Sequence, residues 1–448
     1  MLCVVTAVQT PPRTRRVHPA WWVAAVTFLA LIGAAAFRSV PGVLIEPLQQ
    51  EYGWSLSTIS LAIAINLALY GLTAPFAAAL MERFGIRRVV VCALLVVALG
   101  SGLTVFMTAS WQLVLCWGVL VGLGTGSMAM SLVATVTGRW FVARRGLVVG
   151  LLTASAATGQ LAFLPVAAWM IEHWGWRSAV APVFVGAVLI AFLCLALVRD
   201  RPSDLGLRPY GQTPEAAAAP AASAAAMTWR TPFTTLREVS GHRTFWVLAG
   251  TFFICGLSTN GLVQTHFISL CGDNGLSAVP AASVLAMMGA FDFVGTILSG
   301  WLSDRYDNRK LLFWYYGLRG LSLFWLPHSE FTIYGLGLFA MFYGLDWIAT
   351  VPPTVKLAGA AFGPQKVGLV FGWIFAAHQL GAAAAAYGAG FSRTLLLTYT
   401  PALYAAGAAC LVAALVVMAI RRPGVPAGTS PPASPSSPAR ASSAAARA

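Results

Sequence analysis

The sequence predicts an all-α integral membrane protein with twelve transmembrane helices. Of its 448 residues, 58% are apolar and only 9% are charged, against roughly 25% charged residues in soluble globular proteins. Apolar runs long enough to cross about 30 Å of hydrocarbon recur along the chain. Short basic segments separate these runs, as is typical of loops between transmembrane helices. This composition excludes a soluble enzyme.

Twelve segments reach the length of roughly 20 residues that a membrane-spanning helix needs. We expect spans 1 to 12 near residues 20–44, 57–81, 88–108, 112–137, 147–170, 178–198, 244–269, 280–302, 311–327, 332–355, 367–390 and 398–420. Arg13, Arg15 and Arg16 precede span 1 without a short apolar stretch and a small-residue cleavage site. We therefore expect span 1 to stay in the membrane and not to be removed as a signal peptide.

The positions of the 28 Lys and Arg residues predict the orientation. All but four lie before span 1, after the even-numbered spans or in the C-terminal tail. Arg177 and Arg393 lie on the other side, and Arg38 and Arg319 lie inside spans. Because cytoplasmic loops carry the excess of basic residues, we expect both termini in the cytoplasm of a multi-pass protein of the inner (plasma) membrane. The basic residues form no single cluster, so nucleic acid is not an expected partner.

Five regions follow from this pattern. We expect a cytoplasmic N-terminal tail (1–19), a first set of six spans (20–198), a cytoplasmic connector rich in Ala and Pro (199–243), a second set of six spans (244–420) and a disordered cytoplasmic tail (421–448). The seven cysteines form no C-x-x-C pair. Neither a metal site nor a disulfide framework is therefore indicated.

One loop sequence occurs in both halves, which indicates an internal duplication. The segment after span 2, AALMERFGIRR (78–88), superimposes on the segment after span 8, GWLSDRYDNRK (300–310), with a shift of 222 residues. The coinciding charged positions are Glu82 and Asp304, Arg83 and Arg305, Arg87 and Arg309, and Arg88 and Lys310.

The repeated loop resembles the signature G-x-x-x-D-R-x-G-R-[RK] of the major facilitator superfamily, and the resemblance covers about residues 20–420. Ala78 and Glu82 depart from the signature in the first copy, and Asp307 departs from it in the second. The resemblance implies two pseudo-symmetric six-helix bundles around a central cavity, lined mainly by spans 1, 2, 4, 5, 7, 8, 10 and 11. It also implies that the charged loop residues hold the cytoplasmic helix ends together as a gate.

Two further strings look like the monocarboxylate and oxalate/formate porter group of this superfamily. They are RPSDLGLRPYG (201–211), after span 6, and FRSVPGVLIEPLQQEYGWS (37–55), which closes span 1. Their alternative interpretation is purely structural, as a loop cap and a periplasmic turn.

Five ionisable side chains inside spans stand out, because a charge there costs about 2.5 to 3.5 kcal/mol on insertion scales. They are Arg38, Asp292, Arg319, Asp346 and His378. Arg38 lies about 27 Å along span 1 from Ala20, at 1.5 Å per residue. We expect it in the outer part of the span, where it either snorkels to the interface or attracts an anionic substrate. The monocarboxylate transporters are similar in having a basic residue in the outer part of span 1.

Asp292 in span 8 is the candidate proton carrier, because burial favours the protonated carboxyl and a nearby cation favours the carboxylate. The monocarboxylate transporters have an Asp in span 8 followed one turn later by an Arg, and here Thr296 takes the place of that Arg. Arg319 could neutralise either Asp292 or Asp346. A structural Arg319–Asp346 pair is favoured, because spans 9 and 10 are neighbours joined by a short turn.

Several uncharged or titratable polar residues in the spans are candidates for substrate binding. Asn260 and Gln264 share a helix face in span 7, while His266 is turned away from it by about 160°. The other candidates are Gln160, His378 and Gln379, with packing as the alternative role of His378.

We therefore expect a secondary active transporter of a small organic anion, a mono- or dicarboxylate, driven by proton symport through alternating access. Arg38 would receive the carboxylate and Asp292 the proton, so that the loaded site is nearly neutral. The alternatives are an anion exchanger, an exporter of drugs or other amphipathic solutes, and a receptor that binds without transport. No catalytic motif or cofactor is expected, and the expected partners are the substrate anion, protons and membrane lipid around a monomer.

Overall fold

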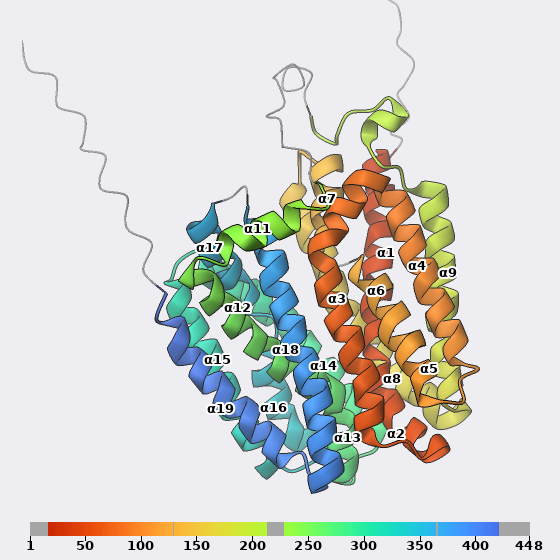
Figure 1. Ribbon diagram of the computed structural model, residues 1–448, viewed down its shortest axis with the longest axis vertical. Helices are drawn as coiled ribbons and strands as arrows, with labels where there is room; N and C mark the ends of the chain where they lie inside the picture. The colour runs from red at the N-terminus through yellow and green to blue at the C-terminus, as the bar shows by residue number, and fades with distance from the viewer. Residues whose placement is uncertain (1–16, 129, 213–227, 364–365, 421–448) are drawn as a thin grey trace, which may run out of the picture.

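The described chain consists of long helices arranged in two bundles. The computed structural model describes residues 17–128, 130–212, 228–363 and 366–420. Within these ranges no β-strand occurs, and a single bridge joins Phe141 to Tyr210. Helices of the N-terminal half, red to yellow, lie on the right of Figure 1, and helices of the C-terminal half, green to blue, lie on the left.

The N-terminal half contains spans 1 to 6, some of which are built from several helical segments. Its elements are α1 (Pro19–Ser39), α2 (Pro41–Tyr52), α3 (Leu56–Phe84), α4 (Ile86–Thr104), α5 (Ser110–Leu113), the π-helical η1 (Val114–Val121), α6 (Gly122–Gly126), α7 (Met130–Trp140), α8 (Arg145–Trp174) and α9 (Trp176–Leu197).

The connector and the C-terminal half follow. The connector holds the short η2 (Pro202–Leu205) and α11 (Thr231–Val239). Spans 7 to 12 are formed by α12 (Arg243–Gly256), the π-helical η3 (Leu257–Gln264), α13 (Thr265–Asp273), α14 (Ala278–Ser303), α15 (Asn308–Trp325) with η4 (Leu326–His328), α16 (Ile333–Asp346), α17 (Val351–Phe362), α18 (Val367–Leu396) and α19 (Thr400–Val417).

Ten helical stretches in the described residues are long and apolar enough to cross a bilayer. They correspond to all expected spans except 5 and 9, which α8 and α15 supply as helices of 30 and 18 residues. The predicted fold class, an all-α membrane protein of twelve helices, is confirmed. The expected N- and C-terminal tails and the middle of the connector lie almost entirely outside the described residues.

Span 1 differs from its predicted extent. Pro41 lacks the N–H that a continuous helix needs, and the helix is interrupted at Val40. It then continues as α2, so that the whole stretch runs from Pro19 to Tyr52, 34 residues. Arg38 consequently lies near the middle of this stretch and not in its outer part, which corrects the expected depth.

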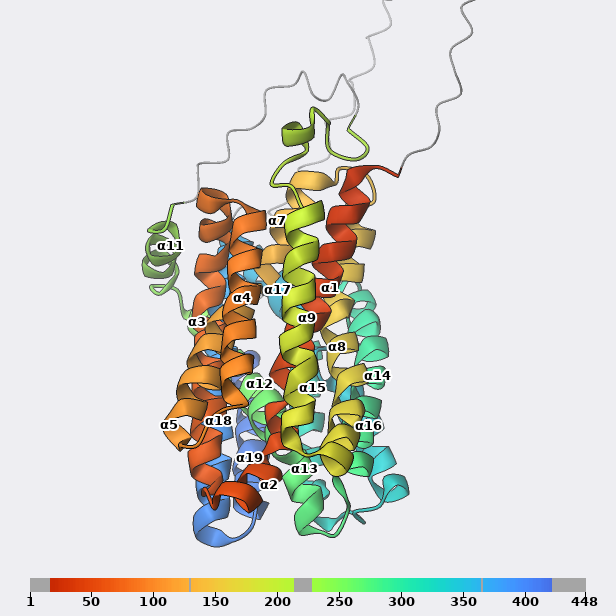
Figure 2. The same cartoon turned by 90° about the vertical axis from the view of Figure 1, so that its right-hand side faces the viewer.

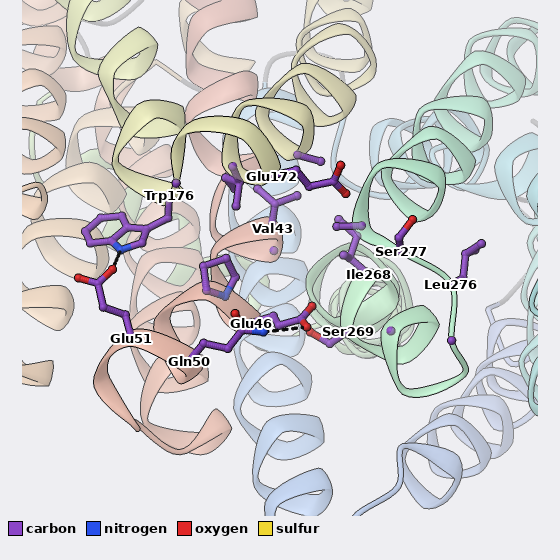
Figure 3. Close-up of a pocket in the computed structure, with 18 residues that line it drawn as sticks. Val43, Glu46, Gln50, Glu51, Glu172, Trp176, Ile268, Ser269, Leu276 and Ser277 are labelled. Carbon is purple, nitrogen blue, oxygen red and sulfur yellow. Dashed lines mark hydrogen bonds between the residues drawn. The ribbon is translucent and has the colours of Figure 1, made fainter.

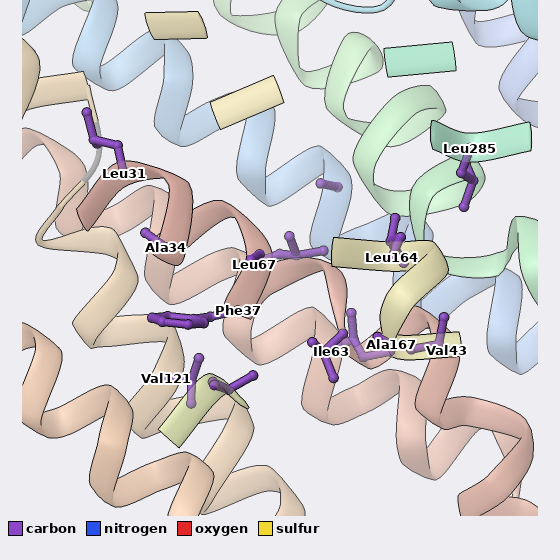
Figure 4. Packing of buried hydrophobic residues seen from close by; sticks show 14 of the residues in the cluster. Leu31, Ala34, Phe37, Val43, Ile63, Leu67, Val121, Leu164, Ala167 and Leu285 are labelled. Atoms are coloured by element: carbon purple, nitrogen blue, oxygen red, sulfur yellow. The ribbon is translucent and has the colours of Figure 1, made fainter. Parts of the chain in front are cut away.

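The two bundles share an apolar core. Figure 4 shows Leu67 of α3 between Phe37 of α1 and Leu164 of α8, with Leu285 of α14 beyond Leu164. Where α3 meets α18, Gly71 permits close approach, because a Cβ at this position would lie 2.3 Å from Cβ of Gln379. This contact places Gln379 directly against the N-terminal bundle.

One end of the molecule carries the connector, and we call it the connector end. The start of α1 lies there in both views (Figures 1 and 2), and Figure 1 shows the start of α12 and the described end of α19 on the same side. α11 crosses between the bundles at this end. Phe233 packs on Phe76 of α3 with ring centroids 5.0 Å apart, and the indole of Trp373 on α18 donates to the Pro232 carbonyl at 2.9 Å.

The loop after span 6, residues 201–211, is packed onto the N-terminal bundle. The Tyr210 N–H donates to the Trp140 carbonyl at 2.8 Å. The Tyr210 ring contacts the rings of His18 and Trp21, with the ring centroids 5.6 Å apart in each case. Just before the loop, Asp200 accepts a hydrogen bond from the Arg87 backbone N–H at 2.8 Å, at the first turn of α4. The string thus has a local structural role as a cap on this end.

Candidate functional site

Arg38 lies at the last turn of α1, next to the interruption of span 1. Its guanidinium carbon is 4.1 Å from the ring centroid of Tyr70 on α3, a cation–π contact. Its Nε is buried and has no hydrogen-bond partner among the described residues. After the interruption, α2 continues the span for another 12 residues. The Arg38 side chain is therefore held between helices and does not reach the end of the span.

Aromatic rings connect Arg38 to span 11. Tyr70 packs against Phe375 of α18 with centroids 5.7 Å apart, and Phe375 stacks on His378 at 5.8 Å. Phe252 of α12 covers His378 from another side at 4.7 Å. His378 is therefore enclosed by aromatic rings within the same region as the fixed cation.

Some of the buried polar atoms without described partners lie in spans 1, 7 and 11. Besides Arg38 Nε, they include Gln264 Oε1, His378 Nδ1 and Gln379 Oε1. Buried polar groups are nearly always hydrogen-bonded, so such atoms are candidates for contact with a polar ligand. Spans 1 and 7 approach closely here, since a Cβ at Gly42 would lie 3.2 Å from the Gln264 carbonyl oxygen. These four residues, with Tyr70, form what we call the central cluster.

The remaining predicted substrate residues are placed differently. Asn260, like Gln264, lies on the π-helical η3 and is half-buried, and π-helical turns are frequent at functional sites. His266 packs inside the C-terminal bundle, with Nε2 2.8 Å from the Ala386 carbonyl and Nδ1 3.3 Å from the Tyr399 hydroxyl. Gln160 lies on α8, and its side chain falls outside the described residues.

Arg319 and Asp346 form a buried ion pair in the C-terminal bundle. Arg319 Nε lies 2.7 Å from Asp346 Oδ2, and Arg319 Nη1 lies 2.9 Å from Cys255 Sγ. Arg319 Nη2 also donates to the backbone carbonyls of Asp346 and Trp347, at 2.5 and 3.3 Å. Of the two partners considered for Arg319, the structure thus pairs it with Asp346.

Asp292 is buried on α14, with an exposed fraction of 3%, and no ion pair to it occurs among the described residues. Its Oδ1 accepts hydrogen bonds from the Ile348 N–H at 2.9 Å and the Thr296 hydroxyl at 3.0 Å. Ile348 lies in the junction between the end of α16 and the start of α17. Its N–H therefore has no partner within a helix. Asp292 supplies that partner, and Arg319 holds the same junction from the other side.

At the connector end, the repeated loops form equivalent ion pairs. Glu82, at the end of α3, pairs with Arg139 at the end of α7. Asp304, just after α14, pairs with Lys356 on α17. Spans 2 and 4 correspond to spans 8 and 10 in the duplication, so the two contacts are related by the repeat. The hydrogen bond and the positive charge of Lys356 hold the pKa of Asp304 below its ordinary value.

The arginines of the repeated loops make other contacts. Arg83 and Arg305 lie over aromatic rings of their own helices, Phe84 at 5.2 Å and Trp301 at 4.1 Å. Arg87 donates to the Leu195 carbonyl of α9. Arg309 pairs with Asp307 at 2.6 Å and donates to the Ile420 carbonyl at 2.9 Å, past the end of α19.

The opposite end holds two ion pairs that sequence reasoning did not identify. Arg177 of α9 lies 2.8 Å from Glu51 of α2, and Arg393 of α18 lies 2.7 Å from Asp273 of α13. Each pair stays within one bundle. The signal in the sequence was that Glu51 and Asp273 are separated by the repeat shift of 222 residues.

Between these pairs a cavity of about 750 Å³ separates the bundles. Figure 3 shows Glu46 and Glu172 of the N-terminal bundle in this cavity, with Ile268 and Ser269 of α13 on the other wall. Because its walls come from α2, α8, α13 and α14, any movement of the bundles changes its shape.

The family is decided by a comparison with known families. The model described as Major Facilitator Superfamily matches residues 27–386. The chain belongs to the major facilitator superfamily. The predicted resemblance is thereby confirmed, and the protein is a multi-pass membrane transporter and not an enzyme.

Individual relatives agree with this assignment. The chain is 25% identical to an uncharacterized MFS-type transporter, YcxA, of Bacillus subtilis (strain 168), over 85% of this chain and 89% of the relative. It is 26% identical to monocarboxylate transporter 13 of Bos taurus, over 81% and 80%. It is 23% identical to monocarboxylate transporter 4 of Rattus norvegicus, over 86% and 79%.

A solved structure shows the same fold. The crystal structure of a bacterial homologue of the human lysosomal transporter Spinster, inward-facing and unoccupied, superimposes with a TM-score of 0.65. The superposition covers 90% of this chain and 95% of the other at 15% identity. This similarity supports two six-helix bundles.

Proposed function

We propose that the protein carries a small organic anion, a mono- or dicarboxylate, across the plasma membrane by alternating access, together with a proton. The observation that carries the proposal is the placement of Arg38 near the middle of span 1, with its Nε unpartnered among the described residues. A fixed cation at that depth is costly unless it meets an anion or a cavity. The similarity to monocarboxylate transporters 13 and 4 supports a carboxylate as that anion.

The central cluster provides the chemistry for a carboxylate. Arg38 binds one carboxylate through charge-assisted hydrogen bonds, each about twice as strong as a neutral one. His378 and Gln379 of α18 approach the same region from the other bundle, with Gln264 at the span 1–span 7 contact. A substrate held by both bundles favours their closure around it, which is the requirement for alternating access.

Asp292 is the proposed proton carrier. With Arg319 engaged by Asp346 at 2.7 Å, the Asp292 carboxylate relies on two hydrogen bonds for its stabilisation. Loading a substrate anion on Arg38 and a proton on Asp292 leaves both sites nearly neutral, and a neutral site is the cheaper one to occlude from water. The empty transporter then returns with Arg38 over the ring of Tyr70. A cation–π contact contributes about 2 kcal/mol when desolvated, which favours symport over obligate anion exchange.

The connector end is proposed to face the cytoplasm, since the loops there hold most of the basic residues. The Glu82–Arg139 and Asp304–Lys356 pairs then act as the cytoplasmic gate of a monomeric transporter surrounded by lipid. The charged residues of both repeats, from Glu82 to Arg309, brace the helix ends around these two pairs.

An exporter of amphipathic solutes is the second candidate, and the aromatic walls formed by Phe252 and Phe375 favour it. Uptake into proteoliposomes separates the two. With one pH unit of inward proton gradient, electroneutral symport of one proton with one lactate should accumulate lactate about tenfold, because one unit corresponds to 1.36 kcal/mol. Transport of the cationic dye ethidium with no carboxylate uptake would contradict the proposal.

The Asp292→Asn variant tests the coupling in the same assay. It should lose accumulation driven by the pH gradient and keep exchange of labelled for unlabelled substrate, which needs no proton release. Asp204→Asn, in the connector loop, is the matched control and should behave like the wild type. Full gradient-driven accumulation by Asp292→Asn would remove this residue from the mechanism.

A further inference from the structure

A second cavity lies within the C-terminal bundle, between α14, α15 and α16; Figure 1 labels α15 and α16 at its lower left and α14 near the centre. Its volume is about 490 Å³, and its described lining includes no residue of the N-terminal half. Leu298, Leu318, Leu338 and Phe342 form its rim and are each about half exposed. Exposed apolar side chains in the middle of spans face lipid, so this groove opens to the membrane and not to the central cluster.

The floor of the groove is polar. It contains the Arg319–Asp346 pair, in which Arg319 Nε lies 2.7 Å from Asp346 Oδ2. The other carboxylate oxygen, Asp346 Oδ1, is buried without a hydrogen-bond partner among the described residues. Asp346 as a whole is only 8% exposed. The lining of this apolar groove therefore includes a carboxylate with one oxygen that its ion pair leaves free.

The charge of the floor limits the ligand. Arg319 and Asp346 together are neutral, so the attraction of a cation to Asp346 is offset by its repulsion from Arg319. An anion would compete with Asp346 for Arg319. A charged group at this depth is also costly to desolvate. An uncharged donor, such as a hydroxyl or amide N–H, satisfies the carboxylate oxygen without either cost.

We propose that this groove binds an uncharged lipophilic molecule from the membrane that carries one hydrogen-bond donor. The donor binds Asp346 Oδ1, and the apolar body lies between Leu298, Leu318 and Leu338. From Tyr315 to Trp325 the lining on α15 extends about 15 Å at 1.5 Å per residue. This length fits an alkyl chain lying along the helices.

The occupant would regulate transport, a consequence that rests on the proposed function. The junction after Asp346 is held by Arg319 on the groove side and by Asp292 through the Ile348 N–H on the other. A ligand bonded to Asp346 stabilises the present arrangement of that junction. Span 10 is then slower to change conformation, and turnover falls.

Photolabelling tests the binding site directly. The probes are a diazirine-bearing dodecanol and a diazirine-bearing dodecane, which differ only in the hydroxyl, and labelled peptides are mapped by mass spectrometry. In purified full-length protein in phosphatidylcholine vesicles, the alcohol should label residues 295–346 about fivefold more than the alkane. Leu318→Trp and Leu338→Trp fill the groove and should each reduce this labelling about tenfold. Leu189→Trp, at an exposed position on α9, is the control and should leave it unchanged.

Equal labelling by both probes, or labelling that both tryptophan variants leave intact, would show ordinary lipid contact and overturn the proposal. Labelling requires no transport, so its outcome is independent of the substrate assignment. For the regulatory part, dodecanol should slow carboxylate uptake about threefold in the wild type and not in Leu318→Trp. Equal slowing in both would mean a general effect on the bilayer and would overturn that part.

Discussion

The two halves of the protein are alike at their ends and different in their middles. At the connector end, Glu82–Arg139 in one half repeats as Asp304–Lys356 in the other. Within the membrane, the described N-terminal half offers one cation, Arg38, against an aromatic ring. The C-terminal half holds the buried Arg319–Asp346 ion pair and, separate from it, the buried acid Asp292. Duplication preserved the contacts that hold helices together, while the buried charges diverged into different tasks.

The largest expected difference between the halves is in stability. Arg319→Ala leaves Asp346 charged and buried, and breaking such a pair costs about 3–5 kcal/mol. The double variant Arg319→Ala/Asp346→Ala should be less destabilised than either single one, because no charge is left alone. Arg38→Ala breaks no ion pair and should cost far less. Thermal unfolding of the purified variants in detergent measures all four.

A double variant that unfolds as early as Arg319→Ala would show that the pair is not an isolated unit. It would then be coupled to Cys255 or to the carbonyls of the span 10 junction, which also receive hydrogen bonds from Arg319.

The next effect concerns the substrate and belongs to the N-terminal half. Arg38→Ala should weaken carboxylate uptake at low substrate about 10- to 100-fold, since a hydrogen bond to a charged group contributes about 1.5–3 kcal/mol. Arg38→Lys should recover part of the loss, because it keeps the charge without the planar donor geometry. Initial rates across substrate concentrations measure this, with Arg230→Ala in the connector as control. Unchanged kinetics in Arg38→Ala would leave this cation a structural role only.

The smallest expected effect concerns the ion pairs at the connector end, where the two halves are alike. Asp304→Asn and Glu82→Gln should each lower turnover by a factor of about two to five with affinity intact, as exposed pairs are weak. Glu82 keeps a second basic neighbour, Arg201 at 3.2 Å. Restored turnover in the charge-swapped Asp304→Lys/Lys356→Asp would show that the contact itself matters. A loss of affinity at normal turnover would contradict a gating role.

The gate pair also has a defined pH range. Lys356 lowers the pKa of Asp304 from its ordinary value of 3.8. The pair therefore contributes fully above that value and is lost only as the pH falls through the lowered pKa. Between about pH 5 and 8 it should not titrate, so Asp304→Asn should be slower than the wild type with the same pH profile. A changed profile would assign proton coupling to the gate.

Sequence reasoning reached the fold because hydropathy, basic loops and one repeated motif agree across the whole chain. It reached Glu82 and Asp304 for the same reason, but it missed Arg139 and Lys356, which come from other spans and share no motif with them. Pairing across helices depends on packing, which a single sequence does not display.

The predicted depth of Arg38 is wrong for a different reason. Pro41 and the polar residues near Gln50 indicate the end of a span, whereas the chain resumes a helix to Tyr52. The Arg319–Asp346 pair is the favoured alternative from the sequence, because short connections bring consecutive spans together. The hydrogen bond from Ile348 to Asp292 could not be foreseen, since it depends on where span 10 is interrupted.

The ion pairs at the end opposite the connector determine how an anion would approach. Arg177 and Arg393 are each engaged by an acid of their own bundle, while Glu46 and Glu172 line the cavity between them. The field at this mouth is therefore negative, and it repels a carboxylate at long range instead of steering it inward. Capture then proceeds by unassisted diffusion, and added salt should speed it by screening the repulsion within a Debye length of about 10 Å at 0.1 M.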